Sequence, residues 1–210
     1  MGPSDQIVFI VDDDSRVREA LAELLASRGL NAITFGSAAE YIEFQRPDLP
    51  ACLILDVRLP DIDGLELQRQ IAGGGHPPIV FISGHGDIAS SVRAIKAGAL
   101  DFLPKPVRAA ELLAAVRSAI TQDIEARVSR AERASLQQRA SRLTPREREV
   151  LPLVVSGLLN KQAAATLSIS EATLQIHRGR IMRKMNADSL AELVRMATLL
   201  EVPMLHRRIP

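Results

Sequence analysis

The chain has 210 residues and a net charge of +1, and 47% of its residues are hydrophobic. This length allows one large domain or two ordinary ones, and the hydrophobic content excludes a wholly disordered chain. The apolar runs are too short to span a membrane, so we expect no membrane partner. The lack of a secretory signal and the single cysteine, Cys52, favour a cytoplasmic protein.

The charge is distributed unevenly along the chain. Residues 1–121 hold 11 basic and 16 acidic side chains (net −5), whereas residues 122–210 hold 15 and 9 (net +6). An acidic half joined to a basic half suggests two domains with different partners, and the basic half suggests nucleic acid. Solvated surface charge would give the same totals, so the charge alone does not decide the function.

The first half alternates apolar strands with helices. Each predicted strand is a short apolar run, and each is followed by helical spacing or by a helix cap such as Ser37. We expect strands over 7–11, 32–35, 52–56, 79–83 and 100–103, with helices starting near 17, 37, 64, 87 and 109. This alternation indicates a parallel sheet covered on both faces, with right-handed crossovers.

Reactive side chains follow four of these strands: Asp12 and Asp13, Asp56, Ser83 and Lys105. The carboxyl ends of parallel strands meet at one edge of a sheet, so we expect these groups to lie together. Three neighbouring carboxylates stay ionised only beside a cation, and Mg²⁺ suits hard oxygen ligands and phosphate. An ionised aspartate there is a competent nucleophile for a phosphoryl group, and the central Asp56 is the natural candidate.

Two more acids, Asp61 and Asp63, follow Asp56 in the next loop. A small phosphotransferase using Asp56 covalently and one of them as acid/base is a competing interpretation. However, they lie between a proline and a glycine, which is typical of solvated turn residues, and the short loops offer no substrate cap.

The two halves are joined by a segment without glycine or proline, over residues 109–142. Its apolar residues recur every four positions, which predicts a helix that continues outward from the first domain. We assign residues 122–140 to a helical linker; a coiled-coil seam is the less favoured interpretation, because the heptads are poor.

The second half predicts four helices. Thr144 caps the first, which Pro152 should kink; Asn160 caps a second over 161–167, and Ser189 caps the last. The turn 168–170 joins the second helix to a third over 171–185, which makes a helix-turn-helix.

The third of these helices has two different sides. Leu174, Ile181 and Met185 share one side at about 100° per residue, and small, amide and basic groups occupy the other. Such an outer side fits the major groove, with phosphate contacts from Lys161, Arg178, Arg183 and Lys184. The alternative is an ordinary four-helix subdomain with a solvated basic face.

The strand ends and their neighbours resemble the receiver domain of bacterial two-component response regulators over residues 5–121. The resemblance rests on Val11-Asp12-Asp13, Leu55-Asp56 with Pro60 and Gly64, Ile82-Ser83-Gly84, Lys96-Ala97-Gly98-Ala99 and Lys105-Pro106. It implies a five-stranded doubly wound sheet of order 2-1-3-4-5, with Asp56 as the phosphoacceptor.

The same resemblance assigns the other site residues. Asp13 and Asp56 would bind Mg²⁺ directly, Asp12 through water, and the backbone carbonyl of Arg58 would complete the ligands. Ser83 and Phe102 would be the moving switch pair, Lys105 would bind the phosphoryl group, and the Lys105–Pro106 peptide would be cis.

Residues 141–203 resemble the LuxR-type helix-turn-helix domain, and both halves together are similar to the FixJ/NarL class. The resemblance rests on 144–151, 160–164, Ile176-His177-Arg178 and Lys184-Met185. It places base contacts at Gln175, Ile176 and Gly179, and phosphate contacts at Lys161 and Thr173. Gly179 departs from the longer side chains of the family, so either the backbone approaches DNA closely or readout shifts to Arg180.

These resemblances imply a transcriptional regulator rather than an enzyme. A sensor histidine kinase would phosphorylate Asp56, and phosphorylation would change dimerisation and promoter binding, with RNA polymerase as a further candidate partner. A signalling adaptor whose second domain binds protein is the remaining alternative.

Overall fold

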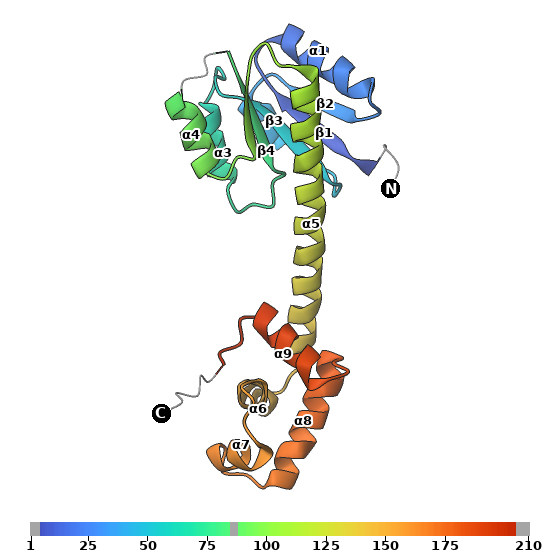
Figure 1. Ribbon diagram of the computed structural model, residues 1–210, viewed down its shortest axis with the longest axis vertical. Helices are drawn as coiled ribbons and strands as arrows, with labels where there is room; N and C mark the ends of the chain where they lie inside the picture. The colour runs from blue at the N-terminus through green and yellow to red at the C-terminus, as the bar shows by residue number, and fades with distance from the viewer. Residues whose placement is uncertain (1–4, 85–87, 205–210) are drawn as a thin grey trace. The chain divides into compact units, whose positions relative to one another are not determined.

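The computed structural model describes residues 5–84 and 88–204, and these residues form two compact units that divide between Arg127 and Val128 (Figure 1). None of the described helices combines the length and apolar character needed to cross a membrane.

The first unit is built on a parallel sheet of five strands in the order β2-β1-β3-β4-β5. The strands are β1 (Ile7–Val11), β2 (Asn31–Phe35), β3 (Ala51–Asp56), β4 (Ile79–Ser83) and β5 (Asp101–Pro104). Every residue of β1, β3 and β4 is buried, which explains why these strands read as unbroken apolar runs. The predicted strand order is confirmed.

Helices cover both faces of this sheet (Figure 1). Side chains of α1 (Ser15–Ala26) and of the first part of α5 (Ala109–Ser141) pack on one face, against Val8 and Ile10 of β1. Those of α2 (Ala38–Glu43), α3 (Gly64–Ile71) and α4 (Ile88–Lys96) pack on the other, against Phe9 and Val11. The alternation along β1 is the two-residue period of a strand, so one strand feeds two cores.

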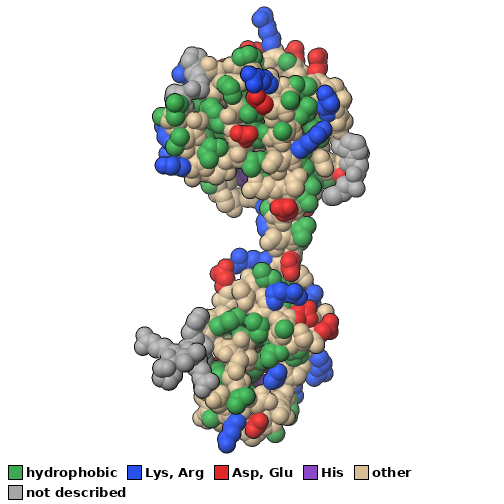
Figure 2. Space-filling view, in the orientation of Figure 1, with side chains coloured by type: hydrophobic (Ala, Val, Ile, Leu, Met, Phe, Trp, Pro, Cys, Tyr) green, Lys and Arg blue, Asp and Glu red, His purple; other side chains and the backbone are tan. Residues whose placement is uncertain are grey.

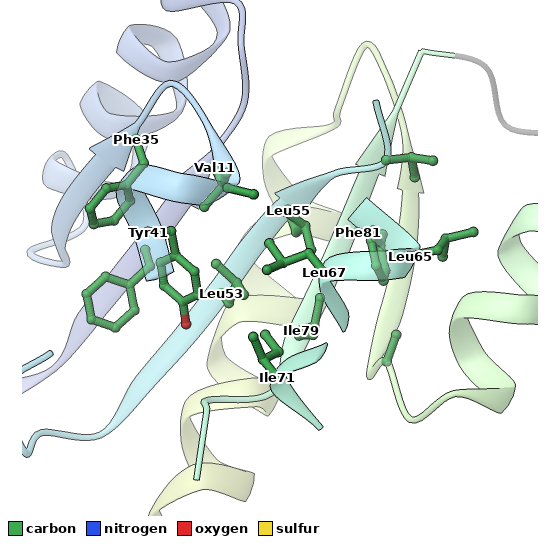
Figure 3. Packing of buried hydrophobic residues seen from close by; sticks show 14 of the residues in the cluster. Val11, Phe35, Tyr41, Leu53, Leu55, Leu65, Leu67, Ile71, Ile79 and Phe81 are labelled. Atoms are coloured by element: carbon green, nitrogen blue, oxygen red, sulfur yellow. The ribbon is translucent and has the colours of Figure 1, made fainter. Parts of the chain in front are cut away.

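The core on the α2, α3 and α4 face is shown in Figure 3. Tyr41 from α2 and Leu67 from α3 are fully buried against Leu53 and Leu55 of β3. The ring of Tyr41 meets that of Phe35 edge-on at a centroid distance of 5.6 Å. Aromatic and aliphatic burial of this kind is worth about 1.5–3 kcal/mol per side chain and fixes β3 in the centre of the unit.

The second unit is helical. Its helices are α6 (Pro145–Val155), α7 (Asn160–Thr166), α8 (Glu171–Met185) and α9 (Leu190–Leu199), together with the last part of α5. Leu174, Ile181 and Met185 are fully buried in its core, as their shared side of α8 predicts. Thr144 and Glu147 form a capping box at the start of α6.

Helix α5 contributes to both cores. Leu112 and Val116 are buried in the first unit, and Leu136 in the second. The segment that we predicted as a linker over 122–140 is helical throughout, and the two units divide within it, between Arg127 and Val128.

One local expectation is wrong, and two others stay predictions. Asn160 is the first residue of α7 rather than its cap, and its side chain accepts a hydrogen bond from Arg178 at 3.1 Å. Pro152 lies inside α6, which continues past it to Val155, and the kink expected there stays a prediction. Helix α4 begins at Ile88 within the described residues, and the residue expected as its start, Asp87, lies outside them.

Surface charge of both signs occurs on each unit. On the face drawn in Figure 2, basic and acidic side chains are interspersed with apolar ones, and neither sign covers a unit by itself.

Candidate functional site

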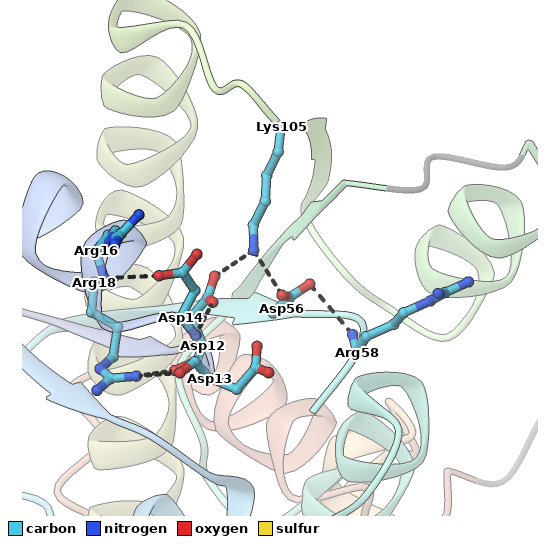
Figure 4. A network of polar contacts seen from close by, with 8 residues as sticks. All are labelled: Asp12, Asp13, Asp14, Arg16, Arg18, Asp56, Arg58 and Lys105. Carbon is cyan, nitrogen blue, oxygen red and sulfur yellow. Dashed lines mark hydrogen bonds and ion pairs between the residues drawn. The ribbon is translucent and has the colours of Figure 1, made fainter. Parts of the chain in front are cut away.

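Three carboxylates gather at the carboxyl edge of the sheet. Asp12 and Asp13 directly follow β1, and Asp56 is the last residue of β3. Each offers an oxygen within 4.8 Å of the others (Figure 4). The predicted cluster is therefore present, because adjacent parallel strands carry these residues to one edge.

Lys105 bridges two of these carboxylates. Its Nζ lies 2.6 Å from Asp12 Oδ2 and 2.7 Å from Asp56 Oδ2. Its backbone N–H donates to the carbonyl of Ser83 at 2.8 Å, which ties the loop after β5 to the end of β4. Burial acts to lower the pKa of Lys105, but the two carboxylates outweigh it and raise the pKa above its usual value. The ammonium group thus stays charged at this edge.

The buried carboxylate of Asp12 gives a test of whether a cation fits. Asp12 is fully buried, and burial raises its pKa above the usual value despite the hydrogen bond from Lys105. A divalent cation beside it would favour the ionised form. Three oxygen donors within reach of one another, beside a loop open to solvent at Asp13, suit Mg²⁺, which keeps several waters.

Arg18, on α1, supports the loop that carries the acids. Its guanidinium donates to the backbone carbonyls of Asp12 and Asp13, at 2.6 and 3.1 Å (Figure 4). The backbone N–H of Asp14 in turn donates to Asp12 Oδ1 at 3.0 Å. The sequence analysis did not predict this supporting role of Arg18. The signal for it was a basic residue in the first turn of the helix that follows the acidic run.

The loop after Asp56 turns back on the strand end. The N–H of Gly64 donates to the carbonyl of Val57 at 2.8 Å, and a β-carbon at Gly64 would lie 2.3 Å from the carbonyl oxygen of Asp56. Only glycine allows this close approach. The backbone N–H of Arg58 donates to Asp56 Oδ1 at 3.3 Å, whereas a role for its carbonyl in metal binding stays a prediction.

The predicted switch pair lies on β4 and β5. Ser83 is buried at the end of β4, and Phe102 is half-buried on β5, its ring 6.2 Å from that of Phe81. The Lys105–Pro106 peptide is cis, as the resemblance implied.

Asp61 and Asp63 have structural roles. The carboxylate of Asp61 accepts hydrogen bonds from the N–H groups of Ala38 and Ala39, at the start of α2. That of Asp63 accepts from the N–H of Leu65 at 2.8 Å and caps α3. Both carboxylates therefore act at helix starts, as expected of turn residues, and both oxygens of Asp61 accept backbone hydrogen bonds.

Helix α8 presents an exposed side in the second unit. The predicted contact residues Gln175, Ile176, Gly179, Arg180 and Arg183 are all exposed, as is Lys161 at the start of α7. Thr173 is half-buried, and its hydroxyl lies 2.8 Å from that of Ser170, the cap of α8. Arg180 and Arg183 line a pocket of about 430 Å³ beside the start of α6.

Two basic residues of α8 are already engaged within the chain. Lys184 Nζ lies 2.6 Å from Glu147 Oε2, so its charge is already paired with a nearly fully buried carboxylate, and its phosphate contact stays a prediction. Arg178 donates to the side chain of Asn160. For the Lys184 ion pair, the signal in the sequence was the capping box at the start of α6, in which Glu147 follows Thr144 by three residues.

Comparisons with known proteins agree with this geometry. Residues 8–117 match the family model "response regulator receiver domain", and residues 141–197 match "bacterial regulatory proteins, luxR family". Nodulation protein W of Bradyrhizobium diazoefficiens is 47% identical over 95% of this chain and 88% of its own length. The transcriptional regulatory protein FixJ of Azorhizobium caulinodans is 42% identical over 94% of each chain. The solved structure of the response regulator StyR superposes with a TM-score of 0.79 at 46% identity, over 92% of this chain and 98% of that one.

Proposed function

Because the chain belongs to the two-component response regulators that carry a LuxR-type DNA-binding domain, we propose that it is a transcriptional regulator switched by phosphorylation of Asp56. Members of this family regulate transcription in a phosphorylation-dependent way and are not enzymes. A regulator that binds bacterial promoter DNA acts in the cytoplasm, where we also place its sensor histidine kinase partner.

The observation that carries the proposal is the position of Lys105 between Asp12 and Asp56, beside Asp13. Transfer from a kinase phosphohistidine forms a bond between an Asp56 oxygen and phosphorus as the phosphorus–nitrogen bond breaks, and the imidazole takes the electron pair. Lys105 would then turn from the carboxylates to the new phosphoryl oxygens, which need the same positive charge.

The acidic cluster would hold Mg²⁺ through Asp12, Asp13, Asp56 and the carbonyl of Arg58. When bound, the ion supplies the charge that keeps the carboxylates ionised and neutralises the phosphoryl oxygens. Ser83 would donate its hydroxyl to the phosphoryl group, and Phe102 would move into the space behind it.

The switch would be read by the face made of α4, β5 and α5. Three apolar side chains of α4 are unusually exposed: Ile88 at 82%, Val92 at 44% and Ile95 at 46%. They recur at helical spacing, so they form one apolar strip on α4. We propose that phosphorylation presents this strip to a second copy, and that the dimer binds two half-sites on DNA.

DNA would be bound through α7 and α8. Lys161, Thr173, Arg178 and Arg183 would contact phosphates, whereas Gln175, Ile176, Gly179 and Arg180 would face the base edges. RNA polymerase is the further partner that such a regulator would engage at a promoter.

Labelling tests the phosphoacceptor. The chain incubated with radiolabelled acetyl phosphate and Mg²⁺ should take up label, and Asp56→Asn should not. Asp63→Asn, which alters a helix cap in the same loop, is the matched control and should label normally. Undiminished labelling of Asp56→Asn contradicts the assignment.

Salt dependence separates DNA binding from the adaptor alternative. The logarithm of duplex affinity should fall steeply with the logarithm of salt concentration, because phosphate contacts release counterions. Weak, salt-insensitive duplex binding would instead favour an adaptor whose second unit binds protein.

A further inference from the structure

Asp61 joins two segments that border the acidic cluster. It lies in the loop between β3 and α3, and its carboxylate accepts hydrogen bonds from the N–H groups of Ala38 at 3.3 Å and Ala39 at 2.9 Å, at the start of α2. Slight burial acts to raise the pKa of Asp61, but these donors, Ala39 before Ala38, outweigh it and lower the pKa below its usual value. The carboxylate is therefore ionised, which makes both hydrogen bonds charge-assisted.

The start of α2 is connected to the buried acid of the cluster. The N–H of Asp12 donates to the carbonyl of Phe35, the last residue of β2, at 3.2 Å. Two residues separate Phe35 from α2, and the N–H of the first, Gly36, donates to Glu40 Oε2 at 2.8 Å. This hydrogen bond fixes the short connection to the helix. The segment that Asp61 binds therefore continues directly from the strand end that holds Asp12.

On its other side, Asp61 belongs to the loop that begins at Asp56. The backbone N–H of Arg58 donates to Asp56 Oδ1 at 3.3 Å (Figure 4). Leu59 and Ile62 pack against the core, which holds the loop on the sheet, but apolar contacts are not directional. The hydrogen bonds of Asp61 are directional, and they orient this loop relative to the segment that holds Asp12.

We propose that Asp61 is a positioning residue for the phosphorylation of Asp56. By tying the loop to the start of α2, it keeps the carbonyl of Arg58 and the acids at the end of β1 at the separation that one Mg²⁺ needs. Mg²⁺ requires nearly ideal octahedral geometry, so it tolerates little change in the spacing of its ligands. This inference rests on the proposed function and deepens it, because it assigns a role to an acid outside the predicted ligand set.

The competing explanation is that Asp61 only stabilises α2. A carboxylate at a helix start binds free N–H groups and interacts favourably with the helix dipole. Ser37 provides the comparison, because it is the N-cap of the same helix and its hydroxyl accepts a hydrogen bond from the N–H of Glu40 at 3.3 Å. Ser37 belongs to the segment that runs into α2, whereas Asp61 belongs to the loop that carries Arg58.

Three variants of the full-length chain separate these explanations: Asp61→Ala, Asp61→Asn and Ser37→Ala. Asp61→Ala removes both acceptors and should weaken Mn²⁺ binding, measured by electron paramagnetic resonance, on the order of tenfold. Asp61→Asn loses the same charge but keeps one carbonyl acceptor, so it should recover part of that affinity. Ser37→Ala should lower the melting temperature, as Asp61→Ala does, yet bind Mn²⁺ with wild-type affinity.

The initial rate of labelling by acetyl phosphate at limiting Mg²⁺ is a second readout, and it should fall in the same order as the Mn²⁺ affinity. Unchanged Mn²⁺ affinity of Asp61→Ala, or an equal loss in Ser37→Ala, would reduce Asp61 to a helix cap. Equal losses in Asp61→Ala and Asp61→Asn would assign the effect to charge alone. Each of these results overturns the inference, while wild-type labelling on Asp56 leaves the proposed function standing. A wild type that neither binds Mn²⁺ nor takes up label overturns both.

Discussion

The carboxylate of Asp123, on α5, accepts a hydrogen bond from the backbone N–H of Ala51 at 2.9 Å, although 72 positions separate them in the sequence. Asp123 is almost fully buried, and Arg127 Nε donates to the same carboxylate oxygen, Asp123 Oδ2, at 2.7 Å. Arg127 also pairs with Asp48. Helix α5 is thereby fixed to the start of β3, the strand that ends at Asp56, immediately before the two units divide.

We expect Asp123→Asn to destabilise the first unit. The amide cannot neutralise Arg127, so the free energy of unfolding in urea should fall by about 1–3 kcal/mol, the usual cost of an impaired buried polar group. Arg108→Met is the control, because it removes an exposed ion pair with Glu111 near the start of the same helix. It should change the free energy of unfolding by less than about 0.5 kcal/mol. Equal effects of both variants would show that burial of Asp123 is unimportant.

We expect Arg18→Met to weaken metal binding. Arg18 holds the carbonyls of Asp12 and Asp13, so without it the acidic loop should lose its fixed geometry. Loss of supporting contacts around metal ligands typically costs on the order of tenfold in affinity or more. Mn²⁺ binding followed by electron paramagnetic resonance measures this directly, independently of phosphorylation.

Arg16→Met is the matched control for this prediction. It removes the same charge from the same helix, but the Arg16 side chain does not hold the two carbonyls. A lost positive charge by itself should strengthen cation binding. Weaker Mn²⁺ binding in both variants would therefore argue against a positioning role for Arg18.

We expect the charge of Lys184 to contribute to stability and not to DNA binding. Its ammonium group is neutralised by Glu147, whereas Arg183 is exposed and makes no ion pair within the described residues. Arg183→Met should reduce the slope of log affinity against log salt by about 1. Lys184→Met should leave the slope unchanged and lower the melting temperature. A reduced slope for Lys184→Met would restore it as a phosphate contact.

We expect His76 to make stability depend on pH below its ordinary pKa of 6.5. Burial and then Arg46 lower the pKa of His76, so the folded chain binds fewer protons than the unfolded chain. The contribution of His76 to the free energy of unfolding is complete above about pH 6.5. It declines as the pH falls from there toward the lowered pKa.

The surroundings of His76 define the control. Arg46 donates to Nε2 at 3.3 Å, so in the neutral ring Nδ1 carries the proton and lies 3.3 Å from the hydroxyl of Tyr41. Urea denaturation at pH 7.5 and 5.5 should show a smaller loss of stability for His76→Gln than for the wild type. Identical losses would assign the pH dependence to other groups.

The sequence by itself determined the architecture of the first unit and most of its site. Apolar runs that end in Asp12, Asp56, Ser83 and Lys105 predict a parallel sheet, and parallel strands bring their ends to one edge. The starts of the first and last helices of the second unit followed from the predicted caps Thr144 and Ser189, because capping is a local interaction between residues three apart.

Only the tertiary structure decided which polar groups are free to act. The sequence placed Lys184 among phosphate contacts and Asp61 and Asp63 in a turn, without naming their partners. The structure pairs them with Glu147, the start of α2 and the start of α3. Asp123 gave a signal, an acid near the apolar row of α5, but its partner Ala51 lies on a distant strand. Contacts between distant segments depend on how the helices pack on the sheet, and a short-range sequence pattern does not predict that geometry.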